Sequence, residues 1–64
     1  MGEAFYREFR EFMRKYRTRE AREMALRTMK SETILQFSRC CRKIQDAFYY
    51  ARFAQEAEIR EGHG

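Results

Sequence analysis

The sequence predicts an all-α fold, and three observations support this. Proline is absent and glycine occurs only at positions 2, 62 and 64, so no strong helix breaker lies between residues 3 and 61. Helix-favouring residues dominate and β-branched residues are few. Apolar residues recur at spacings of three and four. We therefore expect one small helical domain over residues 1–64.

A first helical arm is expected over residues 3–30. Its aromatic stripe follows helical spacing, through Phe5, Phe9, Phe12 and Tyr16. After this stripe the apolar positions move to another side of the helix: Ala21, Met24, Ala25 and Met29. Thr18, with Glu20 and Glu23 after it, has the features of an N-cap followed by acidic residues in a first turn. A break near residues 17–19 is therefore an alternative to one continuous arm.

A turn is expected at residues 30–32 and a second helical arm over residues 33–61. Thr33 and Gln36 have the spacing of a capping box, and Gly62 is placed as a C-terminal stop. The predicted core stripe of this arm has a regular spacing and consists of Ile34, Phe37, Cys41, Ile44, Phe48 and Ala51.

Three architectures fit these signals. The preferred one is an antiparallel helical hairpin with its turn near Ser31. The others are a three-helix form with the additional break, and a single long helix in a coiled coil. In the hairpin, several large apolar side chains project away from the predicted core stripe: Leu35, Tyr49, Tyr50 and Phe53. Monomers rarely expose such a patch, so we expect a homodimer, assembled as a four-helix bundle, to cover them.

Catalytic and metal sites have little support in the sequence. Cys40 and Cys41 are adjacent, which is not the spacing of a zinc or redox motif. His63 is the only histidine, and Asp46 the only aspartate. We therefore expect a protein that is not an enzyme and that needs no cofactor or metal. Without an apolar export signal or a membrane-length apolar run, we expect no membrane association and a cytoplasmic or other reducing compartment.

The basic residues are the most informative feature. The formal charge is +4, and only three of the 14 basic residues are lysine. In the hairpin, basic residues of the two arms would form one belt: Arg14, Lys15, Arg17, Arg19, Arg22, Arg39, Arg42 and Lys43. The acidic residues would gather toward the open end: Glu3, Glu8, Glu11, Glu56, Glu58 and Glu61. Arginine binds phosphate through paired hydrogen bonds and stacks on rings.

The belt predicts a small helical regulator that binds nucleic acid as a homodimer. RNA is favoured over DNA, because no helix-turn-helix signature is present. Tyr16 and Tyr49 are candidates for stacking on single-stranded bases. The alternative is a protein-interaction module (an inhibitor, chaperone or adaptor) that presents its aromatic and basic face to a protein partner.

Overall fold

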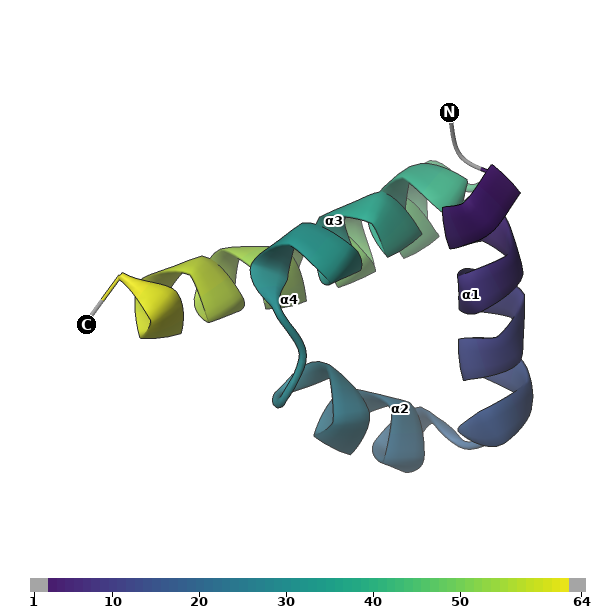
Figure 1. The fold of residues 1–64 in the computed structure, drawn as a ribbon, viewed down its shortest axis with the longest axis horizontal. Helices are drawn as coiled ribbons and strands as arrows, with labels where there is room; N and C mark the ends of the chain where they lie inside the picture. Colours follow the sequence, from purple (N-terminus) through teal and green to yellow (C-terminus); the bar gives the residue numbers. More distant parts are fainter. Residues whose placement is uncertain (1–2, 63–64) are drawn as a thin grey trace.

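The computed structural model describes residues 3–62, and every regular element within them is a helix. The helices are α1 (Glu3–Lys15), α2 (Arg19–Leu26), α3 (Ser31–Cys40) and α4 (Ile44–Glu61) (Figure 1). The prediction of an all-α fold is confirmed. The division into helices differs from the two arms expected from the sequence, and this difference determines which side chains are exposed.

The expected continuous arm over residues 3–30 is wrong, because the chain breaks at Thr18, between α1 and α2, as the alternative from the sequence had it. The backbone of Thr18 is extended (φ −102°, ψ 157°), and its hydroxyl accepts a hydrogen bond from the Ala21 amide at 3.1 Å. This contact satisfies one of the amide groups that a helix start leaves without a partner. Arg22 completes the junction from α2, because its Nη1 donates to the carbonyl oxygens of Tyr16 (3.0 Å) and Arg17 (3.3 Å).

The expected continuous arm over residues 33–61 is wrong, because residues 41–43 are not helical. Cys41 (φ −76°, ψ 138°) and Lys43 (φ −93°, ψ 138°) have extended backbones, which end α3 and precede α4. The chain then turns back, so that α3 and α4 lie side by side and antiparallel (Figure 1). We call this pair the α3–α4 hairpin.

The far end of the α3–α4 hairpin is closed by polar contacts. Helix α3 begins at Ser31, so Thr33 lies inside the helix and is not its cap. The carboxylate of Glu61, at the end of α4, instead accepts hydrogen bonds from the amide and the hydroxyl of Ser31, both at 2.8 Å. Arg60 donates to the carbonyl of Met29 at 3.1 Å. These contacts join the end of α4 to the start of α3 and to the segment that connects α2 and α3.

Helix α1 crosses the α3–α4 hairpin at the end that carries the 41–43 turn (Figure 1). Its rings pack between those of the hairpin: the Phe9 and Phe12 centroids lie 5.2 and 5.1 Å from that of Phe37, and Phe9 lies 5.6 Å from Tyr50. The core therefore closes within one chain, around seven buried side chains: Phe12, Leu26, Ile34, Phe37, Tyr50, Ala54 and Ala57. This arrangement replaces the hairpin with a turn near Ser31.

The 41–43 turn also changes which face of α4 is buried. A continuous helix would place Ile44 and Phe48 on the buried stripe of α3, yet they are 72% and 65% exposed. Extended residues between two helices reset the angular position of every side chain that follows. Tyr50, expected on an outer face, is consequently only 4% exposed.

The residues expected at a dimer interface are mostly used inside the chain. Tyr50 is buried in the core, and Tyr49 and Phe53 are half-buried against it, with their ring centroids 5.3 Å apart. Leu35 remains 40% exposed. These rings therefore do not need a second copy of the chain to cover them.

Candidate nucleic-acid interface

An open groove with a volume of about 1020 Å³ lies between α1, α2, the end of α3 and the start of α4. Five arginines from four segments of the chain line it: Arg10, Arg19, Arg22, Arg42 and Arg52. Asp46 is the acidic residue of the lining. We call this feature the arginine groove.

Aromatic side chains make up much of the remaining wall of the arginine groove. Tyr6 and Phe9 come from α1, and Phe48, Tyr49 and Tyr50 come from α4. Tyr6 is 45% exposed and Phe48 is 65% exposed, so both rings are accessible from solvent. The groove thus combines guanidinium groups with accessible ring faces.

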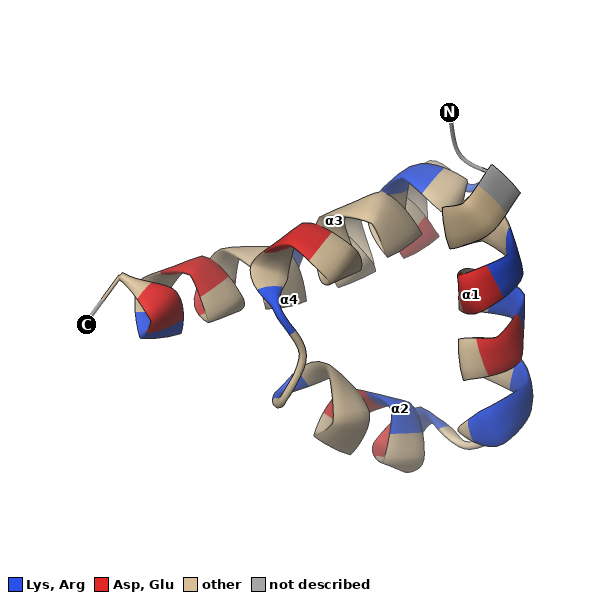
Figure 2. Ribbon diagram, viewed as in Figure 1, with Lys and Arg blue, Asp and Glu red and all other residues tan. Residues whose placement is uncertain are grey.

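Three residues of the predicted belt, Arg19, Arg22 and Arg42, line the arginine groove. They come from α2 and from the 41–43 turn, which lie on different sides of the same hollow. Figure 2 shows basic segments at the α1–α2 junction and at the end of the α3–α4 hairpin that carries the turn. The acidic residues of the α4 C-terminus lie at the opposite end of the hairpin, away from α1, so the predicted acidic cluster does not form.

The other belt residues do not line the arginine groove. Arg14 lines a second, smaller hollow on α1, of about 530 Å³, together with Tyr6, Arg7 and Arg10. The Lys15 ammonium lies 5.4 Å from the centroid of the Tyr16 ring.

Three more members of the belt are exposed and lie outside both hollows: Arg17, Arg39 and Lys43. Tyr16, expected to stack on bases, also lies outside them, because its ring packs on Phe12 with centroids 5.2 Å apart. The structure thus divides the predicted belt, and only part of it faces the groove.

Sequence reasoning missed Arg10 and Arg52. Arg10 is four residues after Tyr6 on α1, and Arg52 is four residues after Phe48 on α4, so each shares a helix face with an exposed ring. That spacing is the signal that could have identified them. The belt was instead chosen from basic residues adjacent in the sequence, which does not follow a helix face.

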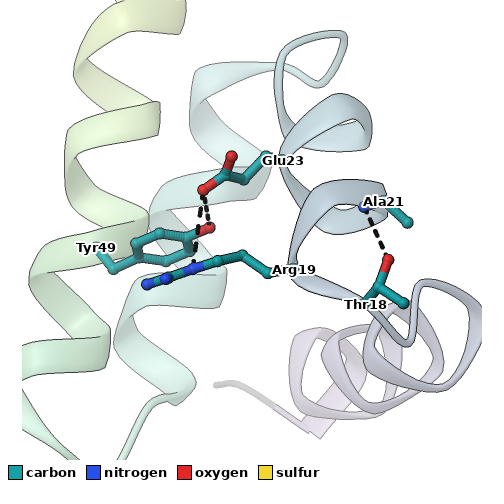
Figure 3. A network of polar contacts seen from close by, with 5 residues as sticks. All are labelled: Thr18, Arg19, Ala21, Glu23 and Tyr49. Carbon is teal, nitrogen blue, oxygen red and sulfur yellow. Dashed lines mark hydrogen bonds and ion pairs between the residues drawn. The ribbon is translucent and has the colours of Figure 1, made fainter.

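Arg19, Glu23 and Tyr49 form a small polar network on the groove wall (Figure 3). Arg19 Nε lies 4.0 Å from Glu23 Oε2, and the Tyr49 hydroxyl donates to the same oxygen at 2.8 Å. The Arg19 guanidinium carbon lies 5.4 Å from the Tyr49 ring centroid. Burial, together with the hydrogen bond to Glu23, raises the pKa of Tyr49, so the phenol remains a neutral donor. The network fixes the ring while the Arg19 side chain stays 77% exposed.

The remaining arginines of the groove are not neutralised by carboxylates. Among the side chains that the structure describes, Arg19–Glu23 is the one ion pair within 4.0 Å. The Nη1 of Arg22 donates to the carbonyls of Tyr16 and Arg17, and these hydrogen bonds hold the Arg22 guanidinium group in the groove lining. Four cationic groups therefore face an open, ring-lined hollow without a paired carboxylate, which favours an anionic ligand.

The two thiols of the groove are protonated at neutral pH. Burial, helped by Asp46 and Cys40, raises the pKa of Cys41 to about 11. Its Sγ donates to the Phe37 carbonyl at 3.4 Å. Burial also raises the pKa of Cys40. A protonated thiol is a poor nucleophile, so these side chains provide packing in the groove wall.

Metal ligands are not grouped within the described part of the chain, where no three His, Cys, Asp or Glu residues could hold an ion together. His63 lies outside the described residues. No helix within residues 3–62 combines the length and the apolar character required to cross a bilayer.

Comparison with protein-family models, with curated proteins and with solved structures gives no significant match. Evidence for function therefore comes from the arginine groove itself.

Proposed function

We propose that this protein is a small, non-enzymatic regulator that binds single-stranded nucleic acid, with a preference for RNA, in the arginine groove. The observation that carries the proposal is the open groove with five arginines, four of them without a paired carboxylate, between accessible aromatic rings. Positive charge along a groove follows a phosphate backbone, and aromatic faces stack on bases of any sequence. Arginine supports both contacts, since it binds phosphate bidentately and stacks on planar groups.

A single strand fits the described helices better than duplex DNA. Helix-turn-helix proteins join two helices at about 90–120° and place the second in the major groove. Here α3 and α4 are also joined by a short turn, but they pack antiparallel along their length (Figure 1). Neither helix is presented as a separate recognition helix. Rings in a hollow are better matched to unstacked bases, the usual targets of sequence-dependent RNA recognition.

The proposal needs one chain only, because all residues of the groove come from one copy. The homodimer expected from the sequence stays a separate prediction. Native mass measured in solution at micromolar concentration tests it, and a mass of one chain would exclude it under those conditions.

The proposal is tested by the salt dependence of oligonucleotide binding. We expect single-stranded RNA of about 12 nucleotides, within the site sizes of known single-strand-binding folds, to bind more tightly than duplex RNA or duplex DNA. The logarithm of affinity should fall with the logarithm of salt concentration, with a slope of about −0.7 per phosphate contacted on a single strand. Fluorescence anisotropy with labelled oligonucleotides measures both quantities.

A charge-matched pair of variants localises the binding. Replacing Arg42 and Arg52 by glutamine should weaken binding and flatten the slope, because both line the groove. Replacing Arg27 and Arg39 by glutamine removes the same charge from exposed positions outside it and should have a smaller effect on both. Equal losses in the two variants would contradict the assignment to the groove. Binding weaker than about 10 µM to all three nucleic acids at physiological salt would exclude the function, since specific complexes are tighter.

A second candidate is the protein-interaction module, which the exposure of Ile44 and Phe48 favours. An apolar protein contact depends little on salt, whereas counterion release makes nucleic-acid binding strongly salt-dependent. The same salt series, carried out on a partner captured from nuclease-treated lysate, distinguishes the two functions.

A further inference from the structure

Phe48 differs from the aromatic residues that follow it. The next two residues, Tyr49 and Tyr50, pack their rings against one another at 5.3 Å, and each also contacts another ring. Phe48 is 65% exposed and pairs with no other ring of residues 3–62. Core packing therefore does not explain why this large ring lines a cationic groove while it is left mostly in water.

The residues around Phe48 indicate which kind of ligand could cover its ring. Phe48, Arg42 and Arg52 all line the arginine groove. On α4, Arg52 is one turn after Phe48, so the two side chains lie on one helix face. Ile44, one turn earlier and 72% exposed, extends this face. The groove that exposes this apolar ring thus also holds two guanidinium groups that have no paired carboxylate among the described side chains.

A second copy of the chain is a poor occupant for this face. Stable interfaces bury about 800 Å² per partner. One aromatic side chain buries roughly 150–250 Å², so Phe48 and Ile44 alone supply well under that area. The arginines of this face would also bring positive charge to both sides of such a contact, and like charges in close contact are unfavourable.

We propose that Phe48 is a nucleobase platform: one base of a bound single strand stacks on its ring while Arg42 and Arg52 hold neighbouring phosphates. This inference rests on the proposed function and assigns the base contact within the same groove. It explains why the ring is exposed and why it shares a groove with cations. It also predicts that the contribution of Phe48 depends on the bases and not on the charge of the ligand.

The chain contains no tryptophan, so Phe48→Trp introduces a single tryptophan at the platform, which can be excited apart from the four tyrosines. We expect its emission to be quenched by single-stranded RNA. An abasic oligonucleotide of the same length and inorganic polyphosphate should leave the emission unchanged, because they provide phosphates without bases. Phe48→Trp should bind single-stranded RNA more tightly than Phe48→Ala, since an aromatic ring is still present to stack.

Phe48→Ala should weaken binding of single-stranded RNA by about 5- to 150-fold, the range for one base stacked on an aromatic side chain. The salt slope should not change, because no charge is removed. The abasic oligonucleotide should bind the variant and the native chain equally. Ile59→Ala is the matched control, since Ile59 is a 59% exposed apolar residue of α4 outside the groove, and it should leave affinity unchanged.

The outcomes separate this inference from the proposed function. If RNA binds with an arginine-dependent salt slope while Phe48→Ala binds equally well, the platform is wrong and the proposed function stands. If no nucleic acid binds the native chain, both are wrong. If Phe48→Ala converts a dimer to a monomer, or the tryptophan emission changes with protein concentration alone, the ring is a contact between copies and the platform is overturned.

Discussion

Phe48 and Tyr50 are two residues apart on α4, yet they lie in opposite environments. Tyr50 is 4% exposed, packs edge-on against Phe9, and donates its hydroxyl to Met13 Sδ at 3.4 Å. Phe48 is 65% exposed at the arginine groove. Both are aromatic residues in one apolar-rich helix, so residue type does not decide their burial. The angular position of α4 after the 41–43 turn decides it.

The largest expected effect is the difference in stability between a substitution in the core and one on the groove face. Phe37→Ala should lower the free energy of unfolding by about 3–5 kcal/mol, because Phe37 is 1% exposed and contacts rings of α1. Phe48→Ala should change it by less than about 1 kcal/mol, since the side chain is mostly in water already. The core stripe expected from the sequence, which includes Phe48, predicts a large loss for both. Chemical denaturation of the two variants decides between these expectations.

A smaller effect on the free energy of unfolding should appear at alkaline pH, from the buried Tyr50 phenol. Burial raises the pKa of Tyr50 to about 12, from an ordinary value of 10.0. Between these values the unfolded chain has lost the phenol proton while the folded chain retains it, so stability should fall as pH rises through this window. Tyr50→Phe removes the phenol and should lose less stability over the same range.

Cys41 contributes in the same direction, from its ordinary pKa of 9.0 to about 11. Unfolding measured at pH 8 and pH 11 should therefore show a smaller alkaline loss in Tyr50→Phe and in Cys41→Ala than in the native chain. An unchanged alkaline loss in both variants would show that neither group is buried as described.

The smallest effect is expected at the other end of α4. Hydrogen bonds from the Ser31 amide and hydroxyl lower the pKa of the exposed Glu61 carboxylate. Its contribution is present above the ordinary value and is lost as pH falls through the lowered value. NMR titration should place this pKa below 4.5, and Ser31→Ala should move it upward.

Local signals predicted the helices, but packing placed the hairpin. The all-α composition and the Thr18 cap depend on neighbouring residues, so the sequence revealed them. The turn at residues 41–43 contains neither glycine nor proline and has no such signal. It is stabilised by contacts between distant residues: the buried Ser38 hydroxyl donates to the Ala47 carbonyl at 2.8 Å, and Ala57 of α4 is fully buried. Tertiary packing overrides a helical propensity of a few tenths of a kcal/mol per residue.

The candidate site, like the fold, was predictable only in part. Arg19 and Arg42 were found because they lie beside helix ends, where sequence neighbours are also spatial neighbours. Arg10 and Arg52 were missed because their position depends on where α1 crosses the hairpin and on the angular position of α4. The four-residue spacing from Tyr6 and Phe48 was a signal for each ring–arginine pair, but the meeting of the two pairs in one groove depends on the 41–43 turn.

Amide chemical-shift mapping with single-stranded RNA tests the central claim most directly, because it reports the position of the ligand without changing the protein. We predict that the largest changes occur along the arginine groove, at Arg10, Arg19, Arg42, Phe48 and Arg52. Residues at the end of the α3–α4 hairpin away from the 41–43 turn, such as Ser31 and Arg60, should change little. Changes centred on that end, or no changes with RNA in excess at physiological salt, would contradict the account.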